Sequence, residues 1–116
     1  MNNYKITYKN IGNNVAQLNA GVTLAIQDQV NAEKHNNLPH NAFIITNQDT
    51  TCTLFLFLDD FSDADSPFAV LFPTQTISVS IEDGVSFTTL WIKNTHATSN
   101  ISAKAIKYNI QTIKQV

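Results

Sequence analysis

Hydrophobic and polar residues alternate on both sides of a short glycine-containing loop in the middle of the chain. The alternating apolar positions are Ile77, Val79, Ile81, Val85 and Phe87. Alternation with a period of two indicates β-strands with one buried face. The intervening residues 82–84 end in Gly84, which adopts a positive φ without steric cost. We therefore predict a β-hairpin that sets Val79 opposite Phe87. The same register sets Ile81 opposite Val85.

Similar short apolar runs recur along the rest of the chain and predict further strands. These strands occupy residues 4–9, 15–18, 22–26, 43–46, 51–58, 68–72, 90–92 and 101–110. Asn13 and Asn14 indicate a turn before the second of them. A change of phase at Ala105 predicts a β-bulge, or a segment covered on both faces. Residues 27–41 form the longest irregular stretch, with room for one helical turn at 30–34, and such a stretch is typical of a functional or interface loop.

The run Leu54–Leu58 is apolar at every position. A continuous apolar strand indicates that both of its faces are covered. In a two-layer sandwich only one face meets the core, so Phe55 and Phe57 need a second cover. A loop of the same chain or another subunit would provide it, and the sequence leaves both alternatives open.

Many short strands with regular turn signals, and no long segment with helical periodicity, predict an all-β fold. We expect one antiparallel β-sandwich domain over residues 1–116, with a jelly-roll or Greek-key arrangement of about eight to ten strands. The long loops at 27–41 and 59–67 suit connections that cross between sheets, which favours this arrangement over a closed barrel.

The composition narrows the class of protein. Hydrophobic residues make up 43% of the 116 residues, which suffices for a folded core. The net charge is −2, and all seven cationic side chains are lysines. Because bidentate guanidinium contacts usually recognise nucleic acid, the absence of arginine argues against that partner. The sequence contains neither a secretory signal nor an apolar run that spans a bilayer, so we expect synthesis in a cytoplasm and no membrane partner.

Four aspartates lie close together in the loop at residues 59–67. They are Asp59, Asp60, Asp63 and Asp65. Carboxylate oxygens are the ligands that calcium prefers, so this loop is a candidate calcium site. The spacing does not match an EF-hand loop, which has a glycine at its sharp turn and a closing glutamate. The alternative, which the loose pattern favours, is a solvated loop in which aspartates promote turns. The sequence indicates no other cofactor.

The residue types of catalytic and zinc sites are present without the required pattern. His35 and His40 lack the i, i+4 spacing of a helical zinc site, and we expect them and His96 on the surface. Cys52 is the single cysteine and follows two threonines within a predicted strand, where a buried structural thiol is expected. Three glycines form neither a nucleophile elbow nor a phosphate-binding loop. We predict that the protein is not an enzyme.

Several aromatic residues occupy predicted strands and admit two interpretations. They are Trp91, Tyr4, Tyr8 and Tyr108. If they lay exposed along one face, they would form a platform for stacking sugars, as in carbohydrate-binding modules. The alternative is that they anchor the core or a subunit interface.

Three segments near the carboxyl end carry a resemblance to a known class of proteins. They are FPTQTISVSI at residues 72–81, VSFTTLWIKNT at residues 85–95, and ISAKAIKY at residues 101–108. A strand that begins after proline, an aromatic-rich strand and a small-residue strand follow one another. This pattern resembles the small β-sandwich structural proteins of tailed bacteriophage virions, which serve as capsid decoration or auxiliary proteins or as head–tail and tail components. The similarity is one of style and includes no diagnostic motif.

The resemblance implies a non-enzymatic virion protein, made in the host cytoplasm, that assembles with copies of itself and with other virion proteins. The apolar residues left over for such contacts would be Phe55, Phe57, Trp91, Tyr108, Tyr4 and Tyr8. Substituting Phe57 or Trp91 would then weaken assembly more than it lowers the melting temperature of the monomer. The strand at 4–9 would dock by β-addition, although its lysines also protect an edge from uncontrolled pairing. The alternative function is a carbohydrate-binding module of a fibre or adhesin.

Overall fold

The computed structural model describes residues 4–6, 11–26 and 39–115, and these residues form strands, turns and one short helix. The strands are β1 (Tyr4–Ile6), β2 (Ile11–Asn14), β3 (Thr23–Ile26), β4 (Ala42–Asn47), β5 (Leu54–Leu58), β6 (Ala69–Leu71), β7 (Thr76–Val79), β8 (Leu90–Asn94), β9 (Ile106–Gln111) and β10 (Ile113–Gln115). The 3-10 helix η1 covers Ile81–Asp83.

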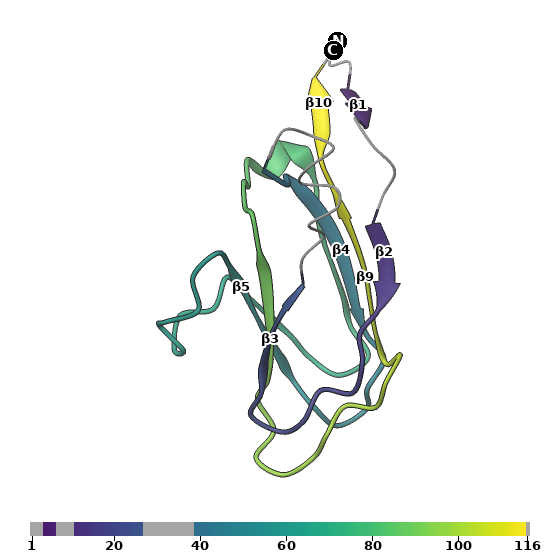
Figure 1. Cartoon of the computed structure of the whole chain (residues 1–116), viewed down its shortest axis with the longest axis vertical. Helices are drawn as coiled ribbons and strands as arrows, with labels where there is room; N and C mark the ends of the chain where they lie inside the picture. Colours follow the sequence, from purple (N-terminus) through teal and green to yellow (C-terminus); the bar gives the residue numbers. More distant parts are fainter. Residues whose placement is uncertain (1–3, 7–10, 27–38, 116) are drawn as a thin grey trace.

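The strands build two four-stranded antiparallel sheets and a separate two-stranded ribbon. One sheet has the order β2-β9-β4-β7, the other β3-β8-β5-β6, and β1 pairs with β10 in the ribbon. Apart from β5 to β6, each step from β2 to β9 takes the chain to the opposite sheet, which is the arrangement of a jelly roll. Figure 1 shows the two sheets facing each other and the ribbon extending beyond one end of them. The predicted all-β antiparallel sandwich is confirmed, and of the two arrangements expected for it the strand order is that of the jelly roll.

Alternate residues of the strands point between the two sheets and form one core. In β8, Leu90 and Ile92 are fully buried, whereas Trp91 between them faces outward and is half-buried. The largest fully buried side chains are Phe43, Phe87, Leu18, Ile45, Leu54, Leu56, Leu71, Leu90, Ile92, Ile101, Ile106 and Ile110. Both sheets and the segments between them contribute, so burial of these side chains holds the two layers together.

The predicted hairpin between residues 77 and 87 is wrong. β7 pairs with β4, where Val79 lies opposite Phe43, and the chain then crosses to the other sheet before β8 begins. The carboxylate of Asp83 accepts a hydrogen bond from the Ser80 N–H at 2.8 Å, and this contact favours one turn of 3-10 helix in place of a hairpin loop. Gly84 ends that turn at a φ of 71°, so the expected positive φ is confirmed in a different structure.

Two further local predictions are also wrong. Asn13 and Asn14 lie inside β2, paired with Tyr108 and Lys107 of β9, and do not form a turn. The change of phase at Ala105 is neither a bulge nor a doubly covered segment, because the chain turns after Ile101 and β9 starts only afterwards. The helical turn expected at 30–34 lies outside the described residues.

Two asparagines at strand ends are fully buried and tie the adjacent loops together. Asn47 ends β4, and its amide donates to the Cys52 carbonyl at 2.9 Å and accepts from the Asp49 N–H at 3.0 Å. Asn94 ends β8, and its amide likewise donates to two backbone carbonyls and accepts a hydrogen bond from one backbone N–H of the adjacent loops. A buried amide satisfies both a donor and an acceptor, which neither a carboxylate nor an apolar side chain of similar size does.

Asp49 stabilises the turn that leads into Cys52. Its Oδ2 accepts hydrogen bonds from the N–H groups of Thr51 at 2.8 Å and Cys52 at 2.6 Å. Partial burial alone would raise the pKa of Asp49, but these hydrogen bonds and the charge of His96 outweigh burial, and the pKa is lowered. A carboxyl group with a lowered pKa in the folded state contributes stability at neutral pH, and that contribution is lost as the pH falls through its folded pKa.

We therefore expect Asp49→Asn to lower the free energy of unfolding at neutral pH. The difference in this free energy between the variant and the wild type should become smaller below about pH 4. Urea unfolding at pH 7 and pH 3 measures both effects. Asp65→Asn is the matched control, because no described hydrogen bond engages the Asp65 carboxylate, and it should follow the wild type at both values. An Asp49→Asn difference that does not shrink in acid would contradict the charge-based explanation.

Candidate functional site

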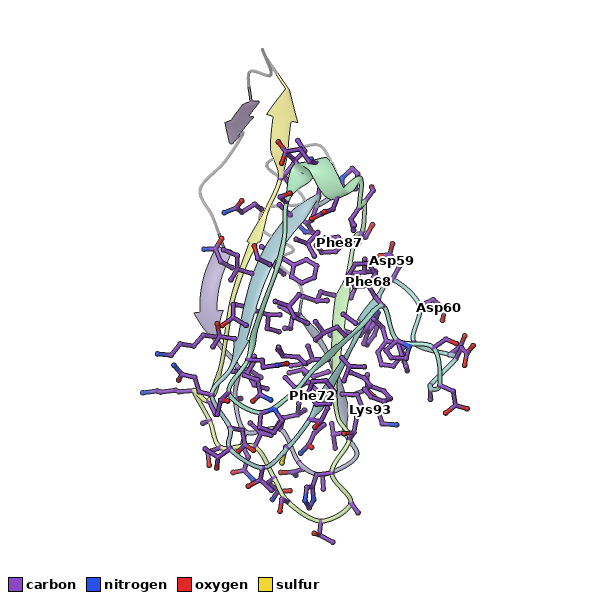
Figure 2. The ribbon with its side chains drawn as sticks, turned by 180° about the vertical axis from the view of Figure 1, so that it is seen from behind. Asp59, Asp60, Phe68, Phe72, Phe87 and Lys93 are labelled. Atoms are coloured by element: carbon purple, nitrogen blue, oxygen red, sulfur yellow. The ribbon has the colours of Figure 1, made fainter. Side chains whose placement is uncertain are left out.

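Exposed phenylalanines gather around β6, the last strand of its sheet. Phe68 and Phe72 flank this strand and are 45% and 53% exposed. Val70 lies between them at the alternate position, half-buried, opposite Phe55 of β5. Figure 2 shows Phe68 near the acidic loop and Phe72 farther from that loop. We call Phe68, Val70 and Phe72 the phenylalanine edge.

The outer side of β6 is an open strand edge. In the described part of the chain β6 pairs with β5 on one side and with no strand on the other. Pro67 and Pro73 enclose the short segment that carries the phenylalanine edge. Because proline cannot donate a backbone hydrogen bond, the two prolines limit how far a further strand could extend along this edge.

The acidic loop that precedes this edge is anchored at Asp59. The Oδ1 of Asp59 accepts hydrogen bonds from the N–H groups of Thr88 at 2.7 Å and Thr89 at 2.9 Å. Its backbone has a φ of 64°, a conformation that aspartate tolerates better than most residues. The Trp91 indole N–H donates to the Asp59 carbonyl at 3.0 Å. Asp59 therefore fixes the loop against the start of β8.

From this anchor the loop covers part of the outer face of the β3-β8-β5-β6 sheet. Phe61 packs on Trp91 with ring centroids 4.3 Å apart, and Phe57 lies opposite Trp91 in the register. Phe57 is only 2% exposed, whereas Phe55, whose ring meets it edge-on, is half-buried. The sequence left open whether the same chain or another subunit buries Phe57. In the structure Phe57 is already buried within the single chain.

The four aspartates of the loop do not converge on one point. Asp60 accepts a hydrogen bond from the Ser62 N–H, which lowers its pKa, and Asp63 accepts one from the Asp65 N–H at 3.2 Å. Among the described residues, which include all four aspartates, no three His, Cys, Asp or Glu side chains are grouped as a metal site would require. The carboxylates of Asp59, Asp60 and Asp63 instead stabilise turns and neighbouring backbone, as in the alternative to a calcium site.

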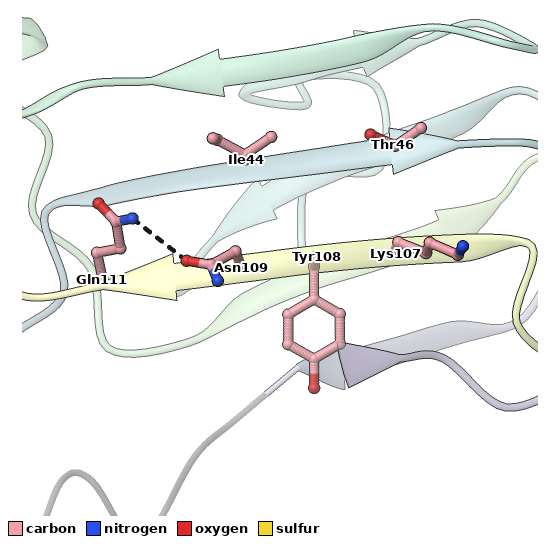
Figure 3. A pocket seen from close by; sticks show the side chains of 6 residues that line it. All are labelled: Ile44, Thr46, Lys107, Tyr108, Asn109 and Gln111. Carbon is pink, nitrogen blue, oxygen red and sulfur yellow. Dashed lines mark hydrogen bonds between the residues drawn. The ribbon is translucent and has the colours of Figure 1, made fainter. Parts of the chain in front are cut away.

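Trp91 and Tyr108, two of the four aromatic residues considered for a sugar platform, lie in different sheets. Trp91 uses its N–H within the chain and has Phe61 packed against its ring. Tyr108 packs against the core cluster and points away from Ile44 and Thr46, as Figure 3 shows. Tyr4 occupies β1 opposite Gln115, and Tyr8 lies outside the described residues. The roles of Phe55, Trp91, Tyr108 and Tyr4 in an interface stay predictions.

The histidines and the cysteine have structural surroundings. His40 was expected on the surface but is 5% exposed, because its backbone pairs with Phe87 and its Nδ1 lies 3.2 Å from the Thr112 hydroxyl. The Nδ1 of His96 accepts hydrogen bonds from two backbone N–H groups of its own loop, and His35 lies outside the described residues. Cys52 is fully buried as predicted, and burial raises the pKa of its thiol.

A shallow hollow of about 340 Å³ lies on the outer face of the β2-β9-β4-β7 sheet. Its lining residues are Ile44, Thr46, Lys107, Tyr108, Asn109 and Gln111. Figure 3 shows that they come from the neighbouring strands β4 and β9. This hollow is not predictable from the sequence, because the two strands are far apart in the chain and only their pairing brings these residues together. The one signal in the sequence is the consecutive apolar run Phe43–Ile45, in which Ile44 falls on the face opposite to that of its two neighbours.

No protein-family model matches this chain, and a search of curated proteins found no significant match. Among the described residues, none forms a helix with the length and apolar character that crossing a bilayer requires. The surfaces described above therefore provide the basis for a functional assignment.

Proposed function

We propose that the protein is a non-enzymatic structural component of a virion, either a capsid decoration or auxiliary protein or a head–tail or tail component. It acts through contacts with copies of itself and with other virion proteins. Two features support this proposal. The jelly roll is a fold that viral capsid domains use, although lectin domains use it as well. The phenylalanine edge supplies an apolar contact surface.

The phenylalanine edge carries the proposal. Large exposed apolar side chains next to charged ones are typical of protein–protein interaction sites. Phe68 and Phe72 each expose about half of their surface, and both flank β6, a strand that within the described residues has no partner on its outer side. A neighbouring subunit that adds a strand or an apolar surface here would bury both rings and satisfy free backbone groups of β6. The two prolines would confine this addition to one short strand.

The test is the mass of the protein in solution, measured by light scattering after size exclusion over a range of concentrations. We expect a discrete oligomer in the wild type. Phe72→Ser and Phe68→Ser should each weaken self-association by roughly tenfold or more, because each removes a side chain whose burial contributes about 1.5–3 kcal/mol. The melting temperature of Phe72→Ser should stay close to that of the wild type, since Phe72 is exposed in the single chain. That of Phe68→Ser should fall modestly, because the Phe68 ring also meets the buried Phe43 ring edge-on at 6.4 Å.

Val22→Ser is the matched control, because Val22 is 43% exposed at the opposite edge of the same sheet. It should leave the oligomer intact. A wild type that stays monomeric at its highest soluble concentration would count against self-assembly through this edge. Equal weakening in Val22→Ser would show that the effect is not specific to the phenylalanine edge.

A further inference from the structure

The outer face of the β2-β9-β4-β7 sheet carries a hollow whose floor is apolar and whose walls are polar. Ile44 lies opposite Asn109, and Thr46 lies opposite Lys107, so four side chains from β4 and β9 share this face. Ile44 is 44% exposed, which is unusual for the middle of a strand whose neighbouring positions are buried. The chain therefore leaves one aliphatic side chain open to solvent within a ring of hydrogen-bonding groups.

Small residues on the neighbouring strands explain why this face is hollow. Gly12 of β2 lies opposite Asn109 on one side, and Ser78 of β7 lies opposite Ile44 on the other. Gly12 has no side chain to place beside Asn109, and Ser78 places only a short one beside Ile44.

The polar walls contain amide and hydroxyl groups with donors and acceptors in close alternation. The Gln111 Nε2 donates to the Asn109 Oδ1 at 3.3 Å, and the hydroxyls of Thr46 and Thr76 are hydrogen-bonded at 2.9 Å. These contacts orient the side chains, as Figure 3 shows for the two amides. Within the described part of the chain, no hydrogen bond engages the Nδ2 of Asn109 or the Oε1 of Gln111.

Lys107 is the single charged side chain among the residues that line the hollow, and no carboxylate accompanies it. In the described residues no ion pair involves its ammonium group. An anionic group entering the hollow would meet this charge without repulsion from the walls. The charge of the hollow thus complements a carboxylate and disfavours a second cation.

We infer that this hollow binds an acidic sugar, a pyranose that carries a carboxylate. The aliphatic face of the ring would pack on Ile44, its hydroxyls would exchange hydrogen bonds with Asn109 and Gln111, and its carboxylate would pair with Lys107. This chemistry is shared by uronic acids of polysaccharides and by sialic acids of glycoproteins. The site lies on the sheet opposite the phenylalanine edge, and its occupation does not depend on the proposed assembly role.

The test is a titration followed by amide chemical shifts on the isotopically labelled full chain, with Phe72→Ser as a second background that should not self-associate. The probes are methyl glucuronide, N-acetylneuraminic acid and the neutral methyl glucoside. Because the hollow is shallow and has no aromatic floor, we expect dissociation constants in the range of about 1 mM. Shifts should concentrate at Ile44, Asn109 and Gln111, and the tighter of the two acidic probes identifies the sugar class.

Two variants separate the parts of the inference. Lys107→Gln should weaken binding of the acidic sugars by roughly tenfold and leave the weaker binding of the neutral glucoside unchanged. Asn109→Ala should weaken binding of all three probes. Lys93→Gln is the matched control, because it removes a lysine from the other sheet, and it should leave the binding of all three probes unchanged.

Three results would overturn the inference. The first is an absence of shifts at the hollow with every probe, and the second is a set of shifts that centres on Trp91. The third is equal binding of methyl glucoside and methyl glucuronide, which would remove the role of the carboxylate. If shifts at Ile44 appear with rising protein concentration and no sugar, a second copy of the chain occupies this face instead.

Discussion

Replacing Phe57 with alanine will destabilise the folded chain by roughly 3–5 kcal/mol, the range expected when a buried phenylalanine is truncated. Phe57 is 2% exposed although it points away from the core between the sheets. The Phe55 ring meets it edge-on, and Trp91, which lies opposite it in the register, carries Phe61 of the acidic loop on its ring. Removing the ring leaves a cavity that the sheet beneath it cannot close, because backbone hydrogen bonds fix the strand positions.

Urea unfolding of the monomeric protein measures this cost, and the melting temperature should fall by more than about 10 °C. Phe72→Ala is the control, because it removes the same side chain from an exposed position of the same sheet and should cost much less. A smaller loss of unfolding free energy in Phe57→Ala than in Phe72→Ala would mean that Phe57 contributes little to the stability of the single chain. A loss of assembly with an unchanged melting temperature would return Phe57 to the role of an interface residue.

Replacing Asn94 with alanine will destabilise the protein by roughly 2–4 kcal/mol, because buried polar groups lose their partners. The Asn94 amide donates to the carbonyls of Ser99 at 2.9 Å and Leu18 at 3.2 Å, and its Oδ1 accepts from the His96 N–H at 3.0 Å. Asn94 is fully buried, so water does not replace these contacts without local opening. The three partners belong to two loops that the variant would release together.

The control is Asn19→Ala, because Asn19 is exposed and its amide oxygen accepts one hydrogen bond from the neighbouring Gln17. Its free energy of unfolding should stay within about 0.5 kcal/mol of the wild type. Amide hydrogen exchange adds a second measurement, since the His96 N–H should lose protection in Asn94→Ala. An equal effect of the two substitutions would contradict the role of burial.

The residues of the proposed functional surfaces can be found in the sequence, but their exposure and contacts cannot be predicted from it. The acidic loop and the aromatic residues are visible in the sequence, but their roles are not. Asp59 is one of four similar aspartates, and only the structure shows that its carboxylate holds the start of β8. The phenylalanine edge is likewise unremarkable in sequence, because exposure depends on β6 being the outermost strand of its sheet.

The sequence alone determines the fold class and the face on which most side chains lie. Alternation at Ile77 and Val79 identifies a strand with one face toward the core, and the lone Cys52, which follows two threonines, is correctly assigned to the interior. These predictions hold because burial of alternate side chains is a local property of a pleated strand. Gly84 belongs to the same group, since a positive φ is a preference of the residue itself.

Only the tertiary structure decides which strands pair and what covers each apolar residue. The pattern around residues 77–87 is compatible with a hairpin, yet β7 and β8 belong to different sheets, because alternation specifies a buried face and not a partner. An apolar run such as Leu54–Leu58 indicates that two faces need cover, but only the structure shows that Phe57 on the outer face is buried within the single chain. The hollow beside Ile44 exists only because β4 and β9, distant in sequence, become neighbours through long-range pairing.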